Sequence, residues 1–273
     1  MFFGFHRAVA ALATACAVWS AAPAAAVAGQ AAKEASCTLI LDMETGETLV
    51  REGICGRRLP PASTFKVPLA VIGFDSEILS GERAPVWPYR PEYDAPKRDR
   101  KDVDPTIWER DSVLWYSREI TRRLGASRFE AYVGRLGYGN GDVSGDEGKG
   151  NSLTHSWLDS SLQISAEEQA GFVRRLLRDE LPVSPRAMAL TRAVLPQFEA
   201  AGGWRVHGKT GTTRLRAAQG RVLVGWFVGW ADSDGRRVVF ARVAVGGATG
   251  EPKGPAERAK FLEALPGLMS AAR

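Results

Sequence analysis

The sequence predicts a mixed α/β fold of the α+β kind, in which one antiparallel sheet is built from both ends of the chain. Strand-like segments occur near the start and again after Gly202-Gly203, helical periodicity fills the stretch between them, and one more helical segment follows. Because strands bury their apolar faces by sharing a sheet, the two strand-rich ends should pair. We expect a sheet subdomain over about 36–62 and 203–273, a helical subdomain over about 104–200, and flanking helices from both ends of the chain.

The composition is that of an ordinary globular protein. With 273 residues, of which 45% are apolar and 25% charged, the chain is long enough for one large domain. The net charge of +5 raises the question of nucleic acid, but basic residues are mixed with acidic ones, and the densest run (97–102) lies in a proline-rich stretch. A solvated loop explains that run better, and no nucleic-acid-binding motif accompanies it.

Residues 1–28 have the pattern of a secretory signal peptide. Arg7 supplies a positive start, 8–19 an apolar stretch, and Ala26-Val27-Ala28 a small-residue cleavage site. The apolar stretch is rich in alanine and is followed by a proline, so a permanent membrane span is not expected. We expect a single domain over 29–273 that is periplasmic or secreted after cleavage.

The three cysteines bear on export. Cys16 lacks the leucine that usually precedes a lipid-attachment cysteine by three residues, so lipidation is not expected. Segments 38–42 and 47–51 are predicted to be strands around a turn, and Cys37 and Cys55 lie symmetrically about that turn. Antiparallel pairing would bring these two cysteines face to face, and an oxidising compartment would favour a disulfide, with two unpaired cysteines as the alternative.

The segment Ser63-Thr64-Phe65-Lys66 combines a nucleophile with a nearby base. Pro68 requires a helix to begin close to Ser63, and the spacing places the serine and lysine side chains on one face. A serine hydroxyl needs a neighbour to take its proton. Lys66 can do so only if burial by the apolar run 67–72 keeps its amine neutral. On spacing alone, a serine-capped helix with a solvated lysine is the simpler interpretation.

The rest of the chain divides into loops, helices and strands. Stretches 84–106 and 140–156 are expected to be loops because they are rich in proline or in glycine, asparagine and serine. Helical periodicity predicts helices over 114–124, 128–136, 166–177 and 185–198. Strands are predicted over 204–208, 222–231 and 237–245, with a hairpin turn at 232–235 and a last helix over about 255–270.

Four further segments fit one catalytic scheme with Ser63 and Lys66. The first would open an inserted helix and hold a second hydroxyl, the second would end a helix at a turn, and the last would place a cation and a hydroxyl on a strand. In chain order they are Ser112-Val113-Leu114, Tyr138-Gly139-Asn140, Trp157-Leu158-Asp159-Ser160-Ser161 and Lys209-Thr210-Gly211.

The series S-T-F-K, Y-G-N, W-L-x-S-S and K-T-G resembles the class D (oxacillinase-type) serine β-lactamases, from about Cys37 to Phe261. Class A enzymes and most penicillin-binding proteins carry S-D-N or S-x-N where this chain has S-V-L. The resemblance implies a β-lactamase/transpeptidase-like fold, hydrolysis of penicillins and oxacillin-type β-lactams, and resistance to these antibiotics. It implies no metal and no cofactor other than carbon dioxide, held as a carbamate on Lys66.

The resemblance also implies roles for individual residues. Ser63 would form the acyl-enzyme, the Lys66 carbamate would act as general base, and the Trp157 indole would donate to that carbamate. The backbone N–H groups of Ser63 and Thr212 would form the oxyanion hole, and Ser112 would pass a proton to the leaving nitrogen. The implied substrate-binding residues, some of which would hold a carboxylate, are Lys209, Thr210, Gly211, Arg258, Leu114 and Leu158.

Some of these residues have simpler structural explanations. Trp157 could be a core aromatic residue, Arg258 a charge on a helix surface, and Tyr138-Gly139-Asn140 a helix stop with a left-handed glycine. The chain departs from the family pattern at Leu114, where the family has valine. We expect the extra methylene to crowd the carbamate pocket.

Other function classes fit the sequence less well. A Ser-His-Asp hydrolase is disfavoured, because only His155 and His207 lie outside the leader and no G-x-S-x-G elbow is present. A transpeptidase or a β-lactam sensor domain would share the acylation step but deacylate slowly, and each would usually bring membrane segments or extra domains. The expected partner is a small β-lactam, without nucleic acid or a stable membrane span, and the protein is expected to be a monomer or a homodimer.

Overall fold

The computed structural model describes residues 1–2, 36–217, 220–246 and 253–272. The predicted signal peptide, apart from its first two residues, and Cys16 lie outside the described residues, as would any helix that precedes the first strand. Within the described ranges, no helix has both the length and the apolar character needed to cross a bilayer.

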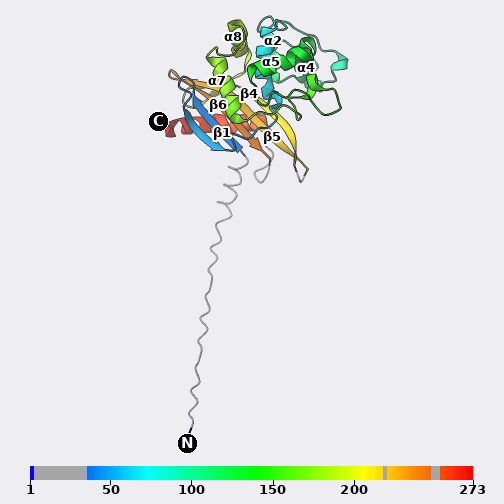
Figure 1. Ribbon diagram of the computed structural model, residues 1–273. Coiled ribbons are helices and arrows are strands. Elements are labelled where there is room, and N and C mark those ends of the chain that lie inside the picture. The colour runs from blue at the N-terminus through cyan, green and yellow to red at the C-terminus, as the bar shows by residue number, and fades with distance from the viewer. Residues whose placement is uncertain (3–35, 218–219, 247–252, 273) are drawn as a thin grey trace.

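The described strands form one antiparallel sheet drawn from both ends of the chain, which confirms the predicted architecture (Figure 1). Their order across the sheet is β2-β1-β6-β5-β4-β3. In the central pairing of the two chain ends, β1 runs antiparallel to β6 with Leu39 opposite Ala241. The bounds are β1 (Ser36–Asp42), β2 (Thr48–Gly53), β3 (Gln197–Ala200), β4 (Trp204–Ala217), β5 (Gly220–Ser233) and β6 (Arg236–Val245).

Alternating side chains give the sheet two buried faces. On one face, Phe227 and Phe240 pack against Phe261 of the last helix, α9 (Gly254–Ala271), with ring centroids of Phe240 and Phe261 4.0 Å apart. On the other face, the neighbouring residues Trp226 and Val239 join a separate apolar core with the inserted helices. This arrangement follows from the two-residue repeat of a strand, which sends successive side chains to opposite faces.

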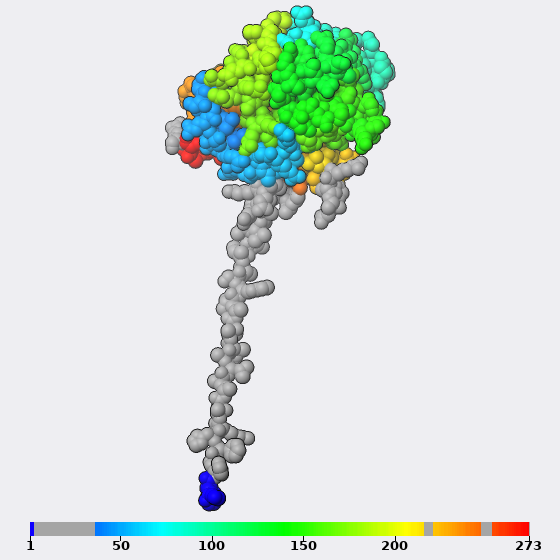
Figure 2. Space-filling model, viewed as in Figure 1, coloured from blue at the N-terminus to red at the C-terminus, as the bar shows by residue number. Residues whose placement is uncertain are grey.

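The helical part is inserted between β2 and β3. In Figure 2 its middle segments, coloured green, form one contiguous mass beside the blue first hairpin. Its elements are the 3₁₀ turn η1 (Ala62–Phe65), α2 (Lys66–Asp75), the 3₁₀ turns η2 (Pro91–Tyr93) and η3 (Lys97–Asp99), α3 (Pro105–Asp111), α4 (Leu114–Leu124), α5 (Ala126–Leu136), α6 (Ser152–His155), α7 (Ala166–Leu177) and α8 (Pro185–Val194). The predicted bounds of α4 and α7 are confirmed.

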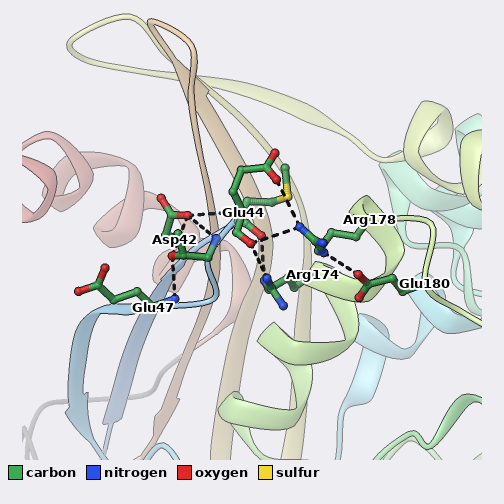
Figure 3. Close-up of polar contacts among 8 residues, drawn as sticks. Asp42, Glu44, Glu47, Arg174, Arg178 and Glu180 are labelled. Carbon is green, nitrogen blue, oxygen red and sulfur yellow. Dashed lines mark hydrogen bonds and ion pairs between the residues drawn. The ribbon is translucent and has the colours of Figure 1, made fainter.

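Polar contacts connect the β1–β2 turn to the end of α7 (Figure 3). Arg174 donates to the carbonyl oxygens of Met43 and Glu44 at 2.8 and 2.7 Å. Arg178 lies 3.3 Å from the Glu44 carboxylate and donates to Glu180 at 2.6 Å. The hairpin from the start of the chain is therefore attached to the helical part as well as to the sheet.

The predicted disulfide is confirmed. Cys37 and Cys55 are bonded, with their Cα atoms 5.0 Å apart, and both side chains are fully buried. Cys37 lies opposite Gly53 in the β1–β2 register, so the chain needs to advance only two residues past that pair to reach its partner. Antiparallel pairing about the turn brings the two sulfur atoms together, as expected from the symmetric positions of the two cysteines about that turn.

The prediction that 84–106 is followed directly by a helix opened by Ser112 is wrong. Helix α3 (Pro105–Asp111) comes first, and Ser112 ends it in the left-handed region with φ 59°, so that α4 begins at Leu114. The start of α3 carries ordinary signals, because Asp104 accepts from the Ile107 N–H at 2.7 Å and a proline follows the cap. The helix is short enough for its periodicity to be weak.

The remaining differences are in lengths. The helix predicted over 185–198 ends at Val194, because a proline lies at 196 and Phe198 belongs to the short edge strand β3. The loop predicted over 140–156 contains the one-turn helix α6. Strands β4 and β5 extend well beyond the predicted ranges, since they form a long two-stranded ribbon in which pairing with each other maintains the extended backbone.

Candidate active site

The turn that carries Ser63 is held by hydrogen bonds from two sides. Ser63 lies in η1 and is partly exposed, and Lys66 is the first residue of α2. The Thr64 hydroxyl donates to the Pro61 carbonyl at 2.6 Å, and the Trp226 indole donates to the Pro60 carbonyl at 3.0 Å. The turn thus holds a partly exposed serine, and the lysine one turn later is buried.

Lys66 is a buried amine without a partner. Its side chain is 1% exposed, and Nζ has no hydrogen-bond partner among the described residues. Burial, with a contribution from the charge of Lys209, lowers the Lys66 pKa to about 7, and Glu109 opposes the shift. Because a lysine in water has a pKa of about 10.4, this environment gives the amine a substantial neutral population near pH 7, as base catalysis requires.

The strand with the K-T-G motif passes directly against the nucleophile turn. β3 pairs with β4 only as far as His207, which leaves the edge of the following part of β4 without a strand partner among the described residues. A Cβ atom at Gly211 would lie 2.8 Å from the Pro61 carbonyl oxygen and 3.1 Å from the Thr64 nitrogen. Only glycine allows this approach of two backbones, which explains why the motif needs Gly211 beside Ser63.

Lys209 connects this strand to the second serine. Its Nζ donates to Ser112 Oγ at 3.0 Å and to the Thr210 carbonyl at 3.1 Å, in a site where Lys209 is 2% exposed. Burial lowers the Lys209 pKa to about 8, with Glu109 opposing the shift and Arg258 adding to it. The K-T-G lysine is therefore hydrogen-bonded to the S-V-L serine, a contact that was not predicted from the sequence.

Residues of β4 alternate between two environments. Lys209 and Thr213 face the helical insert, where the Thr213 hydroxyl donates to the Leu158 carbonyl at 2.7 Å. Thr212 faces α9, since its hydroxyl accepts from the Gly254 N–H at 2.9 Å. By the same alternation Thr210 lies on the α9 side. The K-T-G motif therefore presents its lysine and its threonine to different sides of the strand.

Arg258 lies on α9 and is partly buried. Its guanidinium group lies 4.5 Å from the centroid of the Phe198 ring, and its charge contributes to the lowered pKa of Lys209. A side chain that is only a solvated surface charge would do neither. Among the described residues Arg258 makes no ion pair with a carboxylate, so its predicted role in substrate binding stays a prediction.

Trp157 is a core residue beside the nucleophile turn. It is 1% exposed, stacks on Phe65 at a centroid distance of 5.4 Å, and meets Phe129 edge to face. Its carbonyl oxygen accepts from the Ala62 N–H at 2.8 Å. The indole N–H makes no hydrogen bond to a described residue. The packing explanation therefore holds, and the predicted donor role stays a prediction.

Tyr138 belongs to a buried chain of hydrogen bonds that reaches the nucleophile turn. Its hydroxyl donates to Gln169 at 3.0 Å, and Gln169 donates in turn to the Thr64 hydroxyl at 2.7 Å. Burial raises the pKa of the Tyr138 phenol above its ordinary value. Gln169 was not expected from the sequence; a polar residue on the apolar face of α7 is the signal that could have revealed it.

Gly139 and Asn140 have structural roles. Gly139 has φ 58°, and a Cβ atom there would lie 2.1 Å from the Gln163 carbonyl oxygen. Asn140 accepts from the Gln163 N–H at 3.0 Å and donates to the Ser161 carbonyl at 2.9 Å. The Y-G-N motif thus joins the end of α5 to the segment that follows Trp157.

Two further residues, Leu114 and Glu109, are relevant to the chemistry of the site. Leu114, the first residue of α4, is half-buried and packs against the main apolar core, directly after the fully buried Val113. Glu109 of α3 was not identified from the sequence. It is fully buried, its carboxylate has no hydrogen-bond partner among the described residues, and burial raises its pKa to about 7.

This arrangement of side chains defines a class of protein. A serine in a helix-opening turn, a buried lysine one turn later, and a second serine bonded to a strand lysine form the apparatus of penicillin-recognising acyl-transfer enzymes. The fold agrees with that class, since residues 33–265 match the family model for the penicillin binding protein transpeptidase domain.

Two relatives identify the family within that class. The chain is 48% identical to Beta-lactamase OXA-9 of Klebsiella pneumoniae over 254 residues, which cover 90% of this chain and 93% of the relative. The crystal structure of the OXA-427 class D β-lactamase superposes with a TM-score of 0.78 at 37% identity, covering 87% of this chain and all of the other. The chain therefore belongs to the class D serine β-lactamase family.

The fold alone does not separate a hydrolase from a receptor. The C-terminal domain of the Bacillus licheniformis BlaR penicillin-receptor superposes with a TM-score of 0.71 at 22% identity, over 87% of this chain and 91% of the receptor domain. The residues of the site, and not the fold, therefore distinguish a hydrolase from a receptor. Within the described residues, no group of His, Cys, Asp and Glu side chains is placed to hold a metal ion.

Proposed function

We propose that the protein hydrolyses penicillins and related β-lactams through an acyl-enzyme on Ser63, with Lys66 carrying the general base. The observation that supports this most directly is the unpaired amine of Lys66, fully buried one helical turn after a partly exposed serine. Burying an amine without a partner costs the folded protein stability. A catalytic role for the Lys66 amine, which has a pKa of about 7 and lies one helical turn from the nucleophile, explains why the protein has it.

In acylation, Ser63 Oγ forms a bond to the lactam carbonyl carbon while its proton passes to the base at Lys66. The backbone N–H groups of Ser63 and Thr212 stabilise the negative charge that develops on the carbonyl oxygen. Ser112 passes a proton to the leaving ring nitrogen, and Lys209, which donates to Ser112 at 3.0 Å, holds that hydroxyl in position. A water molecule activated by the same base then releases the product.

The site fits a carbon dioxide adduct on Lys66. Only a neutral amine captures carbon dioxide, and the Lys66 environment favours the neutral form. When bound, the adduct supplies an anionic general base. The Trp157 indole N–H, which has no partner among the described residues, and the charge of Lys209 would hold that anion.

Binding of the substrate carboxylate is proposed for the opposite side of the site. The Thr210 hydroxyl and Arg258 would hold the carboxylate on the α9 side of the K-T-G strand, and the charge of Lys209 would add to the attraction from the other side of the strand. Gly211 lets the backbone approach, and Leu114 and Leu158, both half-buried, provide an apolar wall.

The decisive experiment measures hydrolysis of nitrocefin by the purified protein with and without added bicarbonate. We expect repeated turnover, stimulation by bicarbonate after degassing, and loss of turnover in Ser63→Ala. Uptake of one equivalent of labelled penicillin without turnover would replace this proposal with the receptor or transpeptidase alternative.

The cellular location and the extent of the mature chain are also proposals. We infer that the mature chain is a single domain of 29–273, with a sheet part and a helical insert, exported behind the 1–28 signal. The buried Cys37–Cys55 disulfide supports an oxidising compartment. Mass measurement of the protein secreted by its producing cell should show cleavage after Ala28, and an intact N-terminus would contradict this.

A further inference from the structure

Glu109 is an ionisable group that the proposed mechanism does not use. It lies on α3, three residues before Ser112, and is fully buried. Both carboxylate oxygens are without a hydrogen-bond partner among the described residues. Its neighbour Trp108 is held by a 2.9 Å bond to Ser117, so α3 is fixed against α4 and Glu109 cannot easily turn to solvent. Burying an ionised carboxylate without a partner costs free energy. Whether Glu109 is ionised therefore depends on the charges near it.

The charges that act on Glu109 come from the two lysines of the active site. Burial raises the Glu109 pKa to about 7, and Lys209 and Lys66 both act to lower it. Lys66 is also influenced by Asp99 and by Arg118. Asp99 has its own partner, since Arg98 lies 3.3 Å from it. Glu109 is therefore a buried acid without a partner among the described residues, whose pKa responds to two buried amines, whereas Asp99 is paired with Arg98.

We propose that Glu109 is a positioning residue that controls the uptake of carbon dioxide by Lys66. As a carboxylate it favours the ammonium form of Lys66 and repels the carbamate anion, and as a neutral acid it permits the carbamate. The inference rests on the proposed function, in which Lys66 carries the carbamate.

The proton and charge balance supports this assignment. Lys66 Nζ and the Glu109 carboxylate are not hydrogen-bonded to each other, so the proton moves between them through solvent. An N–H bond of the Lys66 ammonium breaks, an O–H bond forms at Glu109, and the neutral amine keeps its lone pair. That lone pair forms the N–C bond to carbon dioxide, and the second proton leaves the nitrogen for solvent. The site begins as an ammonium–carboxylate pair and ends as a carbamate beside a neutral acid. An ionised Glu109 would instead place two anions in one buried site, which is unfavourable.

The proposal predicts that the native protein and Glu109→Gln differ in their affinity for carbon dioxide, and that this difference depends on pH. The glutamine side chain has the shape of the neutral glutamic acid. At pH 8 the carboxylate of the native protein should oppose carbamate formation. The variant should therefore bind carbon dioxide about tenfold more tightly or better, since one pKa unit corresponds to a factor of ten. At pH 6, where Glu109 is largely neutral given its pKa of about 7, the difference should become small.

The test is a titration with carbon-13 bicarbonate, in which the carbamate signal of the protein is followed by NMR against the dissolved carbon dioxide concentration. Native protein, Glu109→Gln and the control Asp99→Asn are compared at pH 6 and pH 8. Asp99 also acts on Lys66 but has a partner, so Asp99→Asn should shift the affinity less. Glu109→Met, which also removes the charge, is measured alongside so that a folding failure of the glutamine variant, visible in a melting curve, does not decide the result.

The outcomes separate the two proposals. Equal carbon dioxide affinities of the native protein and both Glu109 variants at pH 8 would overturn the role of Glu109 while leaving the carbamate in place. A gain in affinity that is the same at both pH values, or one matched by Asp99→Asn, would also overturn it. Absence of any carbamate signal in the native protein would instead remove the carbamate on which the inference rests.

Discussion

Lys209 Nζ donates a 3.0 Å hydrogen bond to Ser112 Oγ, which joins strand β4 to the end of α3 across 97 positions of the chain. The bond uses an acceptor lone pair of the serine and leaves its hydroxyl hydrogen available for donation to another group. It is geometrically possible because Ser112 has the left-handed φ of 59°, which turns the chain between α3 and α4 toward the strand. A hydroxyl held in this way is suited to pass a proton to a leaving nitrogen.

Ser112→Ala should therefore reduce kcat/KM for penicillins by about 10²-fold or more, the usual scale for a positioned proton donor. Lys209 would also lose the acceptor for its ammonium group, so part of the loss reflects its release. Steady-state hydrolysis of benzylpenicillin measures the effect. A variant that folds normally and retains native kcat/KM would show that protons reach the leaving group by another route.

Turnover should fall on the acid side of pH 7. Burial lowers the Lys66 pKa to about 7, so the amine is mostly neutral above that pH and becomes an ammonium ion, which cannot act as a base, below it. The rate at constant dissolved carbon dioxide is expected to rise with pH through this region. Lys66→Ala should lose at least about 10²-fold at all pH values. A native profile that stays flat between pH 6 and 8 would contradict the assignment of the base.

Trp157→Phe should weaken the response to bicarbonate. The substitution retains the ring that stacks on Phe65 at 5.4 Å but removes the indole N–H that is proposed to hold the carbamate. Truncation to alanine is a less clean test, because loss of a buried tryptophan costs about 3–5 kcal/mol in packing. The bicarbonate concentration for half-maximal activity should increase in Trp157→Phe. If it does not change, Trp157 is a core residue only.

Leu114→Val should increase the rate of deacylation and leave acylation nearly unchanged. Leu114 is half-buried at the start of α4, and an extra methylene in a packed pocket typically costs about 1–3 kcal/mol. The hydrolytic water needs a defined position beside the base, whereas acylation does not, so crowding should affect deacylation more. Stopped-flow measurement of both steps decides the matter, and a slower deacylation in the valine variant would refute the crowding argument.

The Cys37–Cys55 disulfide should stabilise the mature protein by about 3 kcal/mol in the chain-entropy model for a loop of this length, the two residues being 18 apart in sequence. The double variant Cys37→Ser, Cys55→Ser is expected to show a correspondingly lower denaturant midpoint. Alkylation of the exported native protein without reductant should find neither thiol. Equal midpoints for the two proteins would show that the bridge contributes no net stability.

Much of this architecture could be predicted because the relevant signals are local. The bounds of α4 and α7 follow from apolar residues recurring at helical spacing, and the first hairpin follows from two strand patterns around a turn. The errors occurred where a local signal was weak. Helix α3 has only seven residues, and α8 was predicted too long because the apolar pattern continues into β3.

The sequence by itself determined the reactive groups and their order along the chain, and it led us to expect the pairing of the cysteines. Only the tertiary structure decided their chemistry. The lowered pKa of Lys66 depends on burial and on Lys209, which is remote in sequence, and the close passage of Gly211 depends on where β3 stops pairing with β4. Glu109 escaped detection for the same reason. A glutamate in a short helix has no unusual local pattern, and its importance arises only when folding places it, without a partner, beside two buried amines.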